Sequence, residues 1–444
     1  MPAARYPDTH VCYRSLVKSH PRIVKGEGCW LEDDAGRRYL DACAGAYVAC
    51  LGHGVPEVVE AVAGQIRRVA YVSGMSFTND AAEALADELA ARALGDLDRF
   101  YFLSSGSDAV EAALKLARQY WVERGREEKS VILALAPGYH GNTLLALSAS
   151  AREHYRRLFR PWLVEVERVP APVAYRCSCR GEDALCRVCS GRAVEDAILR
   201  IGPERVAAFI AEPVGGSSTG AAVPRQEYWR TVREICTRHD VLWIADEILT
   251  GVGRTGTWSA LEPYGVVPDL QVLGKGISGG YAPLAAVAAP RRLLDVLAKG
   301  SGGLLHAQTF SHTPMMCAAG VAAVRYLGAH GLVERSRRMG EVLHRRLGAL
   351  REHAAVGDVR GRGLLAGIEF VADRESRAPY PRAARFAERF TEAAMGQGLM
   401  VWPNVGHVDG TDGDLVVVAP PFIITEAEID EIVDRLRRVL REVS

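Results

Sequence analysis

A succession of short apolar runs, separated by helical or polar stretches, constrains the fold of this 444-residue chain more than any other feature. The runs are rich in Val, Ile, Leu, Ala or aromatic residues, and they lack the clean alternation of a strand with one face in water. Such runs are typical of a parallel sheet that helices cover on both faces. They lie at residues 99–103, 130–136, 205–213, 241–247, 270–276 and 284–290. We therefore predict an α/β fold whose large domain, residues 60–315, is built on a mostly parallel sheet.

The two ends of the chain are predicted to form a smaller α+β domain together. Two helical patterns and then a strand-like run follow the large domain, at residues 316–328, 334–352 and 363–370. Near the other end, GCWLEDDAGRRYLDACAG has the pattern of a β-hairpin that turns at Ala35-Gly36. We assign residues 1–59 and residues 316–444 to this smaller domain.

Charge and hydropathy exclude several classes of protein. Lys plus Arg and Asp plus Glu both number 54, so the formal net charge is zero and gives no case for binding nucleic acid or an anionic membrane. No apolar stretch approaches the ~20 residues of a membrane-spanning helix. The opening residues contain no apolar core of the signal-peptide type, and the ten cysteines, mostly scattered, suggest reduced thiols. We expect a cytoplasmic protein large enough to be an enzyme.

Small and hydroxylic residues follow the first predicted strand. The turn Ser104-Ser105-Gly106-Ser107 separates residues 99–103 from a predicted helix at 108–124. Ligands of open parallel sheets bind outside the carboxyl ends of the strands, and helix N-termini attract anions. The turn could therefore bind a phosphate, but serine-rich turns are also common helix caps.

Charged and aromatic residues follow three other strands. Asp246 ends a very apolar run, where a carboxylate needs a cationic partner or a polar cleft, unless it caps the next turn. Lys275 is flanked by glycines, and burial there would lower its pKa and let it form a Schiff base with an aldehyde; it could also be a surface lysine. Tyr139-His140 could stack on a flat heterocycle or simply pack. Together these strand ends predict a phosphorylated, planar heterocycle with a carbonyl group.

At the level of whole motifs, the sequence resembles the class III pyridoxal-phosphate-dependent aminotransferases, which have fold type I. The resemblance extends from about Gly26 to the C-terminus. Its segments are YLDACAGAYVACLGHGVPEVVEAV (39–62), SSGSDAVEAALKLAR (104–118), GYHGNT (138–143), AEPVGGSSTG (211–220), ADEILTGVGRTG (245–256), PDLQVLGKGISGGYAPL (268–284), TFSHTP (309–314) and RGRGLLAGIEF (360–370). So many motifs in one order make a chance similarity very improbable.

The resemblance implies catalytic roles for three residues. Lys275 matches the lysine that binds pyridoxal 5'-phosphate as a Schiff base and then moves a proton between substrate and cofactor. Asp246 matches the carboxylate that keeps the pyridine nitrogen protonated, so that the ring accepts electrons. Glu212 matches an active-site glutamate near the substrate side.

The other matching positions are implied to surround the cofactor. Tyr139, beside His140, matches the residue stacked on the ring, and Ile248 is expected behind it. The phosphate cup corresponds to Ser105, Gly106 and Ser107. Thr309 matches a threonine that reaches the phosphate from the neighbouring subunit, which implies that the active enzyme is a homodimer. No metal ion is assigned to this site.

Two departures from the family pattern bear on the substrate. Many relatives have Gln where this chain has Leu249, and an apolar residue there is more similar to the amine:pyruvate branch. Many relatives also have an arginine for the substrate carboxylate, whereas residues 391–433 contain neither Arg nor Lys. Another arginine, such as Arg254 or Arg362, could replace it.

These departures favour a transaminase of the omega-transaminase type, which moves an amino group from a primary amine or omega-amino compound to a small 2-oxo acid such as pyruvate. An aminomutase or a decarboxylating aminotransferase of the same family would share every motif. A Rossmann-type nucleotide-binding protein is a more distant alternative, supported only by GVGRTG at residues 251–256.

Four cysteines lie close together in CSCRGEDALCRVC, at positions 177, 179, 186 and 189. Their C-x-C and C-x-x-C spacing could bind zinc tetrahedrally. The span between the two pairs is short, which favours the other interpretation, a surface excursion with reduced thiols. Neither interpretation implies a catalytic role.

Overall fold

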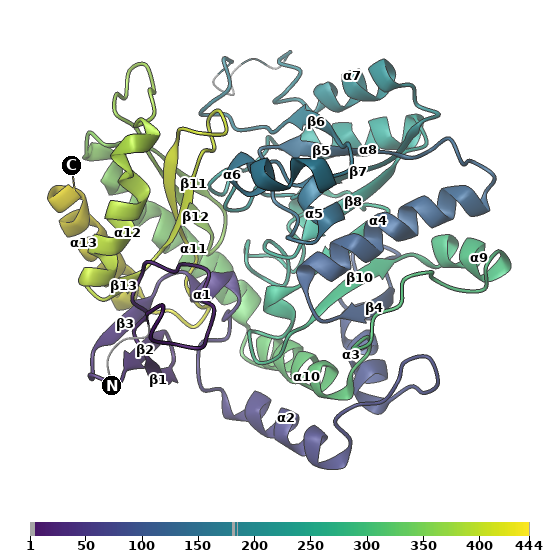
Figure 1. Ribbon diagram of the computed structural model, residues 1–444, viewed down its shortest axis with the longest axis horizontal. Coiled ribbons are helices and arrows are strands. Elements are labelled where there is room, and N and C mark those ends of the chain that lie inside the picture. Colours follow the sequence, from purple (N-terminus) through teal and green to yellow (C-terminus); the bar gives the residue numbers. More distant parts are fainter. Residues whose placement is uncertain (1–4, 180–182, 184, 444) are drawn as a thin grey trace.

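A seven-stranded sheet forms the centre of the protein in the computed structural model, which describes residues 5–179, 183 and 185–443 (Figure 1). In spatial order its strands are β4 (Arg99–Leu103), β10 (Ala285–Ala289), β9 (Leu270–Leu273), β8 (Leu242–Glu247), β7 (Val206–Ala211), β5 (Val131–Ala136) and β6 (Glu167–Pro170). The strands from β9 to β6 are parallel. The predicted fold class, a fold type I α/β protein with a mostly parallel sheet, is confirmed.

One predicted strand differs from the rest in direction. The run at 284–290 forms β10, which is antiparallel to both β4 and β9. Only residues 274–284 separate β9 from β10, and that is too short for the helical crossover that a parallel connection needs. Composition does not reveal this reversal, because β10 is as apolar and as fully buried as the parallel strands β8 and β9.

Helices cover both faces of the sheet, which explains the continuous apolar runs. Ala208 and Ile210 of β7 pack in one core with α4 (Gly106–Glu123) and α9 (Arg291–Lys299). The alternate residue Phe209 packs in another core with α7 (Arg192–Ile201) and α8 (Tyr228–Arg238). Because side chains alternate between two dry faces, polar groups on these strands find water or ligands only at the strand ends.

The N-terminal strands share a sheet with the C-terminal part of the chain. The predicted hairpin is present, with β2 (Trp30–Asp33) antiparallel to β3 (Arg38–Asp41), and β1 (Ile23–Glu27) pairs with β2. On the other edge, β13 (Leu399–Met400) pairs in parallel with β3. In Figure 1 these purple strands lie beside the green and yellow C-terminal elements. The exact domain boundaries stay a prediction, since strand pairing does not assign the segments between strands.

A third sheet and nine further α-helices make up the rest of the described fold. A third sheet has the order β11 (Val356–Gly361), β12 (Ala366–Phe370), β15 (Asp414–Val418) and β14 (Trp402–Val405). The other helices are α1 (Ala44–Tyr47), α2 (Pro56–Arg68), α3 (Asp80–Ala90), α5 (Leu144–Ala149), α6 (Glu153–Arg156), α10 (Pro314–Ala329), α11 (Leu332–Gly348), α12 (Phe386–Gly396) and α13 (Glu426–Val443). In the described part of the chain, no single helix is long and apolar enough to span a membrane, although the bent pair 314–329 and 332–352 would pass by length and composition.

The GVGRTG segment does not have the structure of a dinucleotide-binding loop. Residues 251–256 follow β8 as a series of turns and do not open a helix. A Rossmann fingerprint needs a helix N-terminus at that point, because the helix binds the pyrophosphate. The nucleotide-binding alternative is therefore wrong.

Candidate active site

A cavity of about 750 Å³ lies at the carboxyl ends of the parallel strands. Every residue predicted for the site, apart from Thr309, lines it: Ser105, Gly106, Ser107, Tyr139, His140, Glu212, Asp246, Ile248 and Lys275. They lie at or just after the carboxyl ends of β4, β5, β7, β8 and β9, which are separated in sequence but close in the sheet, where only β10 intervenes between β4 and β9. Thr309 is exposed and does not line the cavity of its own chain.

Asp246 is held in one orientation by two hydrogen bonds. His140 Nδ1 donates to Asp246 Oδ2 at 2.7 Å, and the backbone N–H of Ile248 donates to Oδ1 at 3.1 Å. Both side chains of the His140–Asp246 pair are buried. An ionised carboxylate only accepts hydrogen bonds, so this contact places the imidazole proton on Nδ1. His140 is thus a positioning residue for Asp246.

Lys275 lies two residues after the end of β9, in a short 3-10 turn of residues 275–277. Its φ of +43° is in the left-handed region, which a residue with a β-carbon adopts at a cost that is typical of functional sites. Burial lowers the pKa of the Lys275 ammonium, and the carboxylates of Asp246 and Glu212 partly oppose that effect. The amine is consequently closer to its neutral, nucleophilic form than a surface lysine.

Glu212 follows β7 and is largely withdrawn from water. Its Oε1 accepts from the backbone N–H of Gly216 at 3.0 Å, and its Oε2 accepts from that of Tyr139 at 3.4 Å. Burial raises the pKa of the Glu212 carboxyl to about 7; His140 opposes this rise and the negative charge of Asp246 adds to it. Glu212 can therefore hold or release a proton near neutral pH.

The turn before α4 caps that helix and lines the cavity. The hydroxyl of Ser105 accepts from the backbone N–H of Asp108 at 3.2 Å, so it caps the helix. The Ser107 hydroxyl donates to the side chain of Asn142 at 2.8 Å and accepts from its backbone N–H at 3.0 Å. A β-carbon on Gly106 would lie 2.8 Å from Ile248, which is too close. The helix-cap interpretation is confirmed, and the turn also lines the cavity, whereas phosphate binding by this turn stays a prediction.

Sequence reasoning missed an arginine in the cavity wall. Arg152, which precedes α6, is buried, and its guanidinium lies 5.5 Å from the ring centre of Tyr139 and 5.4 Å from that of Tyr155. One of its amino groups donates to Asn404 on β14, whereas its Nε has no hydrogen-bond partner among the described residues. No local pattern distinguishes this residue from the other arginines that follow it.

The arginines suggested from sequence do not replace the missing cation. Arg254 is buried and donates to the carbonyl oxygens of Leu364 at 2.9 Å and Pro420 at 2.6 Å. Neither Arg254 nor Arg362 lines the cavity. Arg14 does line it; this exposed arginine donates to the hydroxyl of Tyr155 at 2.7 Å.

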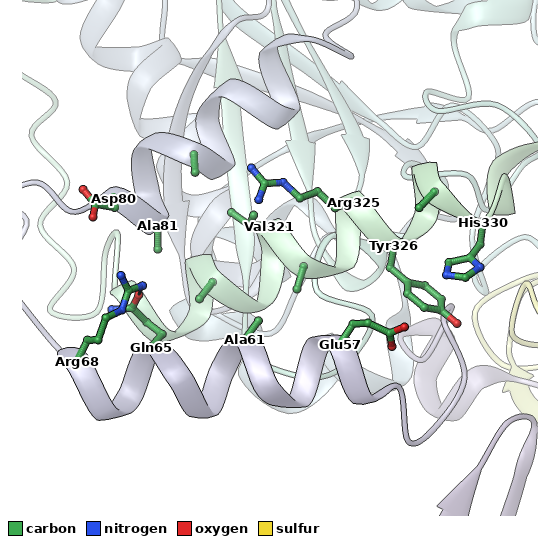
Figure 2. Close-up of a pocket in the computed structure, with 14 residues that line it drawn as sticks. Glu57, Ala61, Gln65, Arg68, Asp80, Ala81, Val321, Arg325, Tyr326 and His330 are labelled. Atoms are coloured by element: carbon green, nitrogen blue, oxygen red, sulfur yellow. Dashed lines mark hydrogen bonds between the residues drawn. The ribbon is translucent and has the colours of Figure 1, made fainter.

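A second cavity, of about 620 Å³, lies between α2, α3 and α10 (Figure 2). Small and apolar side chains such as Ala61 and Val321 form much of its wall, and charged groups such as Glu57 and Arg325 stand around them. It contains none of the residues that follow the strands of the main sheet. The chemistry therefore belongs to the first cavity.

The comparisons with known proteins show the family of this chain. The Aminotransferase class-III family model matches residues 14–440. YodT of Bacillus subtilis, an uncharacterized aminotransferase, is 37% identical over 94% of this chain and 94% of its own. The putrescine–pyruvate aminotransferase of Pseudomonas aeruginosa is 31% identical over 97% of this chain and 93% of its own.

A solved structure shows the same architecture. An (S)-enantioselective omega-transaminase from Thermomicrobium roseum superposes with a TM-score of 0.91 and 33% identity, covering 98% of this chain and 96% of its own. Fold and site together define a pyridoxal-phosphate-dependent transferase. The chain belongs to the class III aminotransferases, and it is a transaminase.

The residues of the cavity fit pyridoxal 5'-phosphate, which this family uses. Lys275 offers an amine of lowered pKa for the aldehyde, and Asp246 offers a buried carboxylate for the ring nitrogen. The N-terminus of α4 offers backbone donors and a positive dipole end for the phosphate. The chemical needs of the cofactor are thus met by groups that the strand ends bring together.

The carboxyl group of Glu212 predicts a pH dependence of stability. Its folded pKa of about 7 is above the ordinary 4.5, so the unfavourable buried charge appears as pH rises through about 7. We expect the ligand-free protein to lose about 2 to 3 kcal/mol of unfolding free energy between about pH 5 and pH 8 from this group. Urea unfolding measured across that pH range should show that the unfolding free energy of Glu212→Gln changes less with pH than that of the wild type. Equal slopes for the two proteins would show that Glu212 titrates normally.

Proposed function

We propose that this transaminase moves an amino group from a primary amine or omega-amino compound to a small 2-oxo acid such as pyruvate. The cavity wall supports this choice, because it combines apolar side chains with a single buried guanidinium. Tyr47, Leu249, Phe159 and Trp402 line the cavity, and the rings of Tyr47 and Trp402 lie 5.5 Å apart. Such a wall suits a donor without a carboxylate.

Arg152 is the proposed partner of the acceptor carboxylate. It is the buried arginine of the cavity wall and has an unpartnered Nε, so a carboxylate would satisfy a donor that the protein leaves open. Arg14 is exposed and already bound to Tyr155, and a contact to it is weakened by water. A cavity with one strong carboxylate-binding site favours a monocarboxylate such as pyruvate over a dicarboxylate such as 2-oxoglutarate.

The cofactor supplies an aldehyde that condenses with amines and a ring that stabilises negative charge at the adjacent carbon. In this scheme Lys275 holds and returns the proton that leaves the substrate carbon, since its lowered pKa suits both directions. Asp246, oriented by His140, would supply a negative charge for the ring nitrogen. Tyr139 and Ile248, which line the cavity, would hold the ring, and the apolar side chains beside them would limit the access of water.

A comparison of two acceptors with one shared amine donor tests the proposal. We expect kcat/KM to be higher for pyruvate than for 2-oxoglutarate, and Arg152→Gln to lower the value for pyruvate about 10- to 100-fold, the cost of a charge-assisted contact of about 1.5–3 kcal/mol. Arg160→Gln is the matched control, because that exposed arginine pairs with Glu153 and lies outside the cavity wall. A higher value for 2-oxoglutarate would overturn the proposed acceptor.

The same assay separates this function from its alternatives within the family. An aminomutase would isomerise the donor without an acceptor, and a decarboxylating aminotransferase would release carbon dioxide from a donor that must carry a carboxylate. Acceptor-dependent turnover of an amine that has no carboxylate distinguishes the proposed transaminase from both.

The proposed enzyme is a homodimer in which Thr309 of one subunit reaches the phosphate bound by the other. Thr309 is exposed, and exposed apolar side chains flank it, since the rings of Tyr71 and Phe310 meet edge to face at 5.9 Å. Met75, 94% exposed, lies in the segment that packs against the residues after Phe310. Exposed apolar patches of this kind mark interfaces.

A cytoplasmic location stays a prediction.

We expect Thr309→Ala to weaken cofactor binding about 10-fold or more, because a hydrogen bond to a phosphate contributes on the order of 1.5–3 kcal/mol. Dilution that yields monomers should release cofactor in the same way. Sedimentation velocity, with absorbance of the bound cofactor as the second signal, measures both. A monomer that retains its full complement of cofactor would contradict the shared site.

A further inference from the structure

Four cysteine sulfurs converge at a site apart from the catalytic cavity. Cys177, Cys179, Cys186 and Cys189 each place a sulfur within 4.8 Å of the other three. The sulfur of Cys179 lies 3.3 Å from that of Cys177 and 3.4 Å from that of Cys189. The sulfurs of Cys177 and Cys186 are 3.6 Å apart. None of the four residues lines the active-site cavity.

These distances match a tetrahedral metal site and not a disulfide. Thiolates bound to one zinc ion at about 2.3 Å lie about 3.8 Å from one another. A disulfide instead holds two sulfurs at about 2.05 Å and leaves the other two unconstrained. Here one sulfur, that of Cys179, has two neighbours at similar distances, so the thiols form a group of four and not two pairs.

Local backbone structure directs the four side chains to one point. The backbone N–H of Cys177 donates to the carbonyl oxygen of Val173 at 2.9 Å, which forms a turn after β6. The N–H of Ser190 donates to the carbonyl oxygen of Cys186 at 3.0 Å, which forms a second turn just before α7. Two tight turns that each present a pair of cysteines are the usual way in which a chain builds a four-sulfur site.

The second turn is packed against neighbouring elements. Cys189 is buried, and it lies three residues before α7, which begins at Arg192. Gly191 brings the second turn against α8, where a β-carbon would lie 3.1 Å from the carbonyl oxygen of Tyr228. Its φ of +83° also favours glycine there.

We propose that these four cysteines bind one structural zinc ion. All four ligand positions come from the protein, so the site is closed and has no position for a substrate. Binding replaces four thiol protons: Zn²⁺ and four S–H groups give one tetrathiolate complex and release four protons. No electron is transferred, and no oxidant or reductant takes part.

The zinc site connects two parts of the fold. The first turn continues from Tyr175 and Arg176, and Arg176 forms an ion pair with Glu369 on β12 and donates to the carbonyl oxygen of Arg377. The second turn leads directly into α7, which packs with α8 on the main sheet. The metal would fix the excursion between β6 and α7 against both the main sheet and the C-terminal sheet, and thus stabilise the fold.

Elemental analysis of the purified transaminase tests the proposal. Protein prepared with a thiol reductant, and without chelator or a metal-affinity step, is expected to contain about one zinc per chain. Cys179→Ser and Cys189→Ser should lose this zinc, whereas Cys12→Ser and Cys236→Ser should keep it, because those cysteines lie elsewhere in the chain. Cobalt reconstitution of metal-free protein should give the intense visible bands of tetrahedral cobalt thiolate.

The wild-type measurement keeps the proposal falsifiable even where a serine variant fails to fold. A strong chelator should lower Tm and expose four additional reactive thiols, and added zinc should reverse both effects. Metal-free wild-type protein, equimolar iron instead of zinc, or a disulfide among the four cysteines by mass spectrometry would each overturn it. The bound-cofactor spectrum reports separately on the catalytic site, so that failure of one assignment leaves the other measurable.

Discussion

Lys275→Ala is expected to abolish transamination and to remove the cofactor's covalent attachment to the chain. Removal of the proton-transfer group alone lowers a rate by about 10²- to 10⁴-fold, and the alanine variant also loses the amine that reacts with the aldehyde. Lys275 lies at the cavity, its pKa is lowered by burial, and the carboxylates of Asp246 and Glu212 are near enough to counteract that shift. Among the described residues, no other lysine lines this cavity.

Borohydride reduction followed by peptide mapping measures the attachment directly. The pyridoxyl label should be found on the peptide with Lys275, and it should be missing from the alanine variant. Lys129 is the stringent internal control, since burial lowers its pKa to about 8 as well, but it donates to the carbonyl oxygens of Pro203, Val206 and Asp240 far from the cavity wall. A label on Lys129, or one that survives in the variant, would refute the assignment.

Asp246→Asn should reduce turnover by at least about 100-fold, which corresponds to about 3 kcal/mol or more of transition-state stabilisation. The amide keeps the shape of the carboxylate but removes its negative charge, so the ring nitrogen loses the partner that keeps it protonated. The amide also changes the contact with His140 Nδ1, which lies 2.7 Å from Oδ2. His140→Asn should therefore shift the pH profile of turnover more than it changes KM.

The neighbouring residue provides a matched control. Glu247 is also a buried carboxylate at the end of β8, but it bonds Gln271 and the backbone N–H of Ala260 and does not line the cavity. Glu247→Gln should keep turnover within a few-fold of wild type, even where its stability falls. Single-turnover kinetics that followed the cofactor spectrum would separate the chemical step from substrate binding. Wild-type rates in Asp246→Asn would show that the carboxylate is not at the ring nitrogen.

Much of the fold and site could be predicted because strands of a covered sheet carry a strong local signal. The run at 241–247 forms β8 almost residue for residue, and the polar residue Asp246 at its end lies in the cavity. Both faces of β8 are dry, so only its carboxyl end tolerates a charged group. The position of a charged residue along the strand therefore indicates whether it belongs to the site. The motif resemblance then implied which ligand these strand ends share.

By itself, then, the sequence determined the class of fold, the strands whose ends form the cavity and most of the residues that line it there. Only the tertiary structure decided the reversed direction of β10, the contact of His140 with Asp246, the place of Arg152 in the cavity wall and the convergence of the four cysteine sulfurs. The physical reason is the range of the interactions. Apolar periodicity and caps act between residues a few positions apart, whereas these contacts join segments through turns and packing, and their geometry exists only once the sheets and helices have assembled.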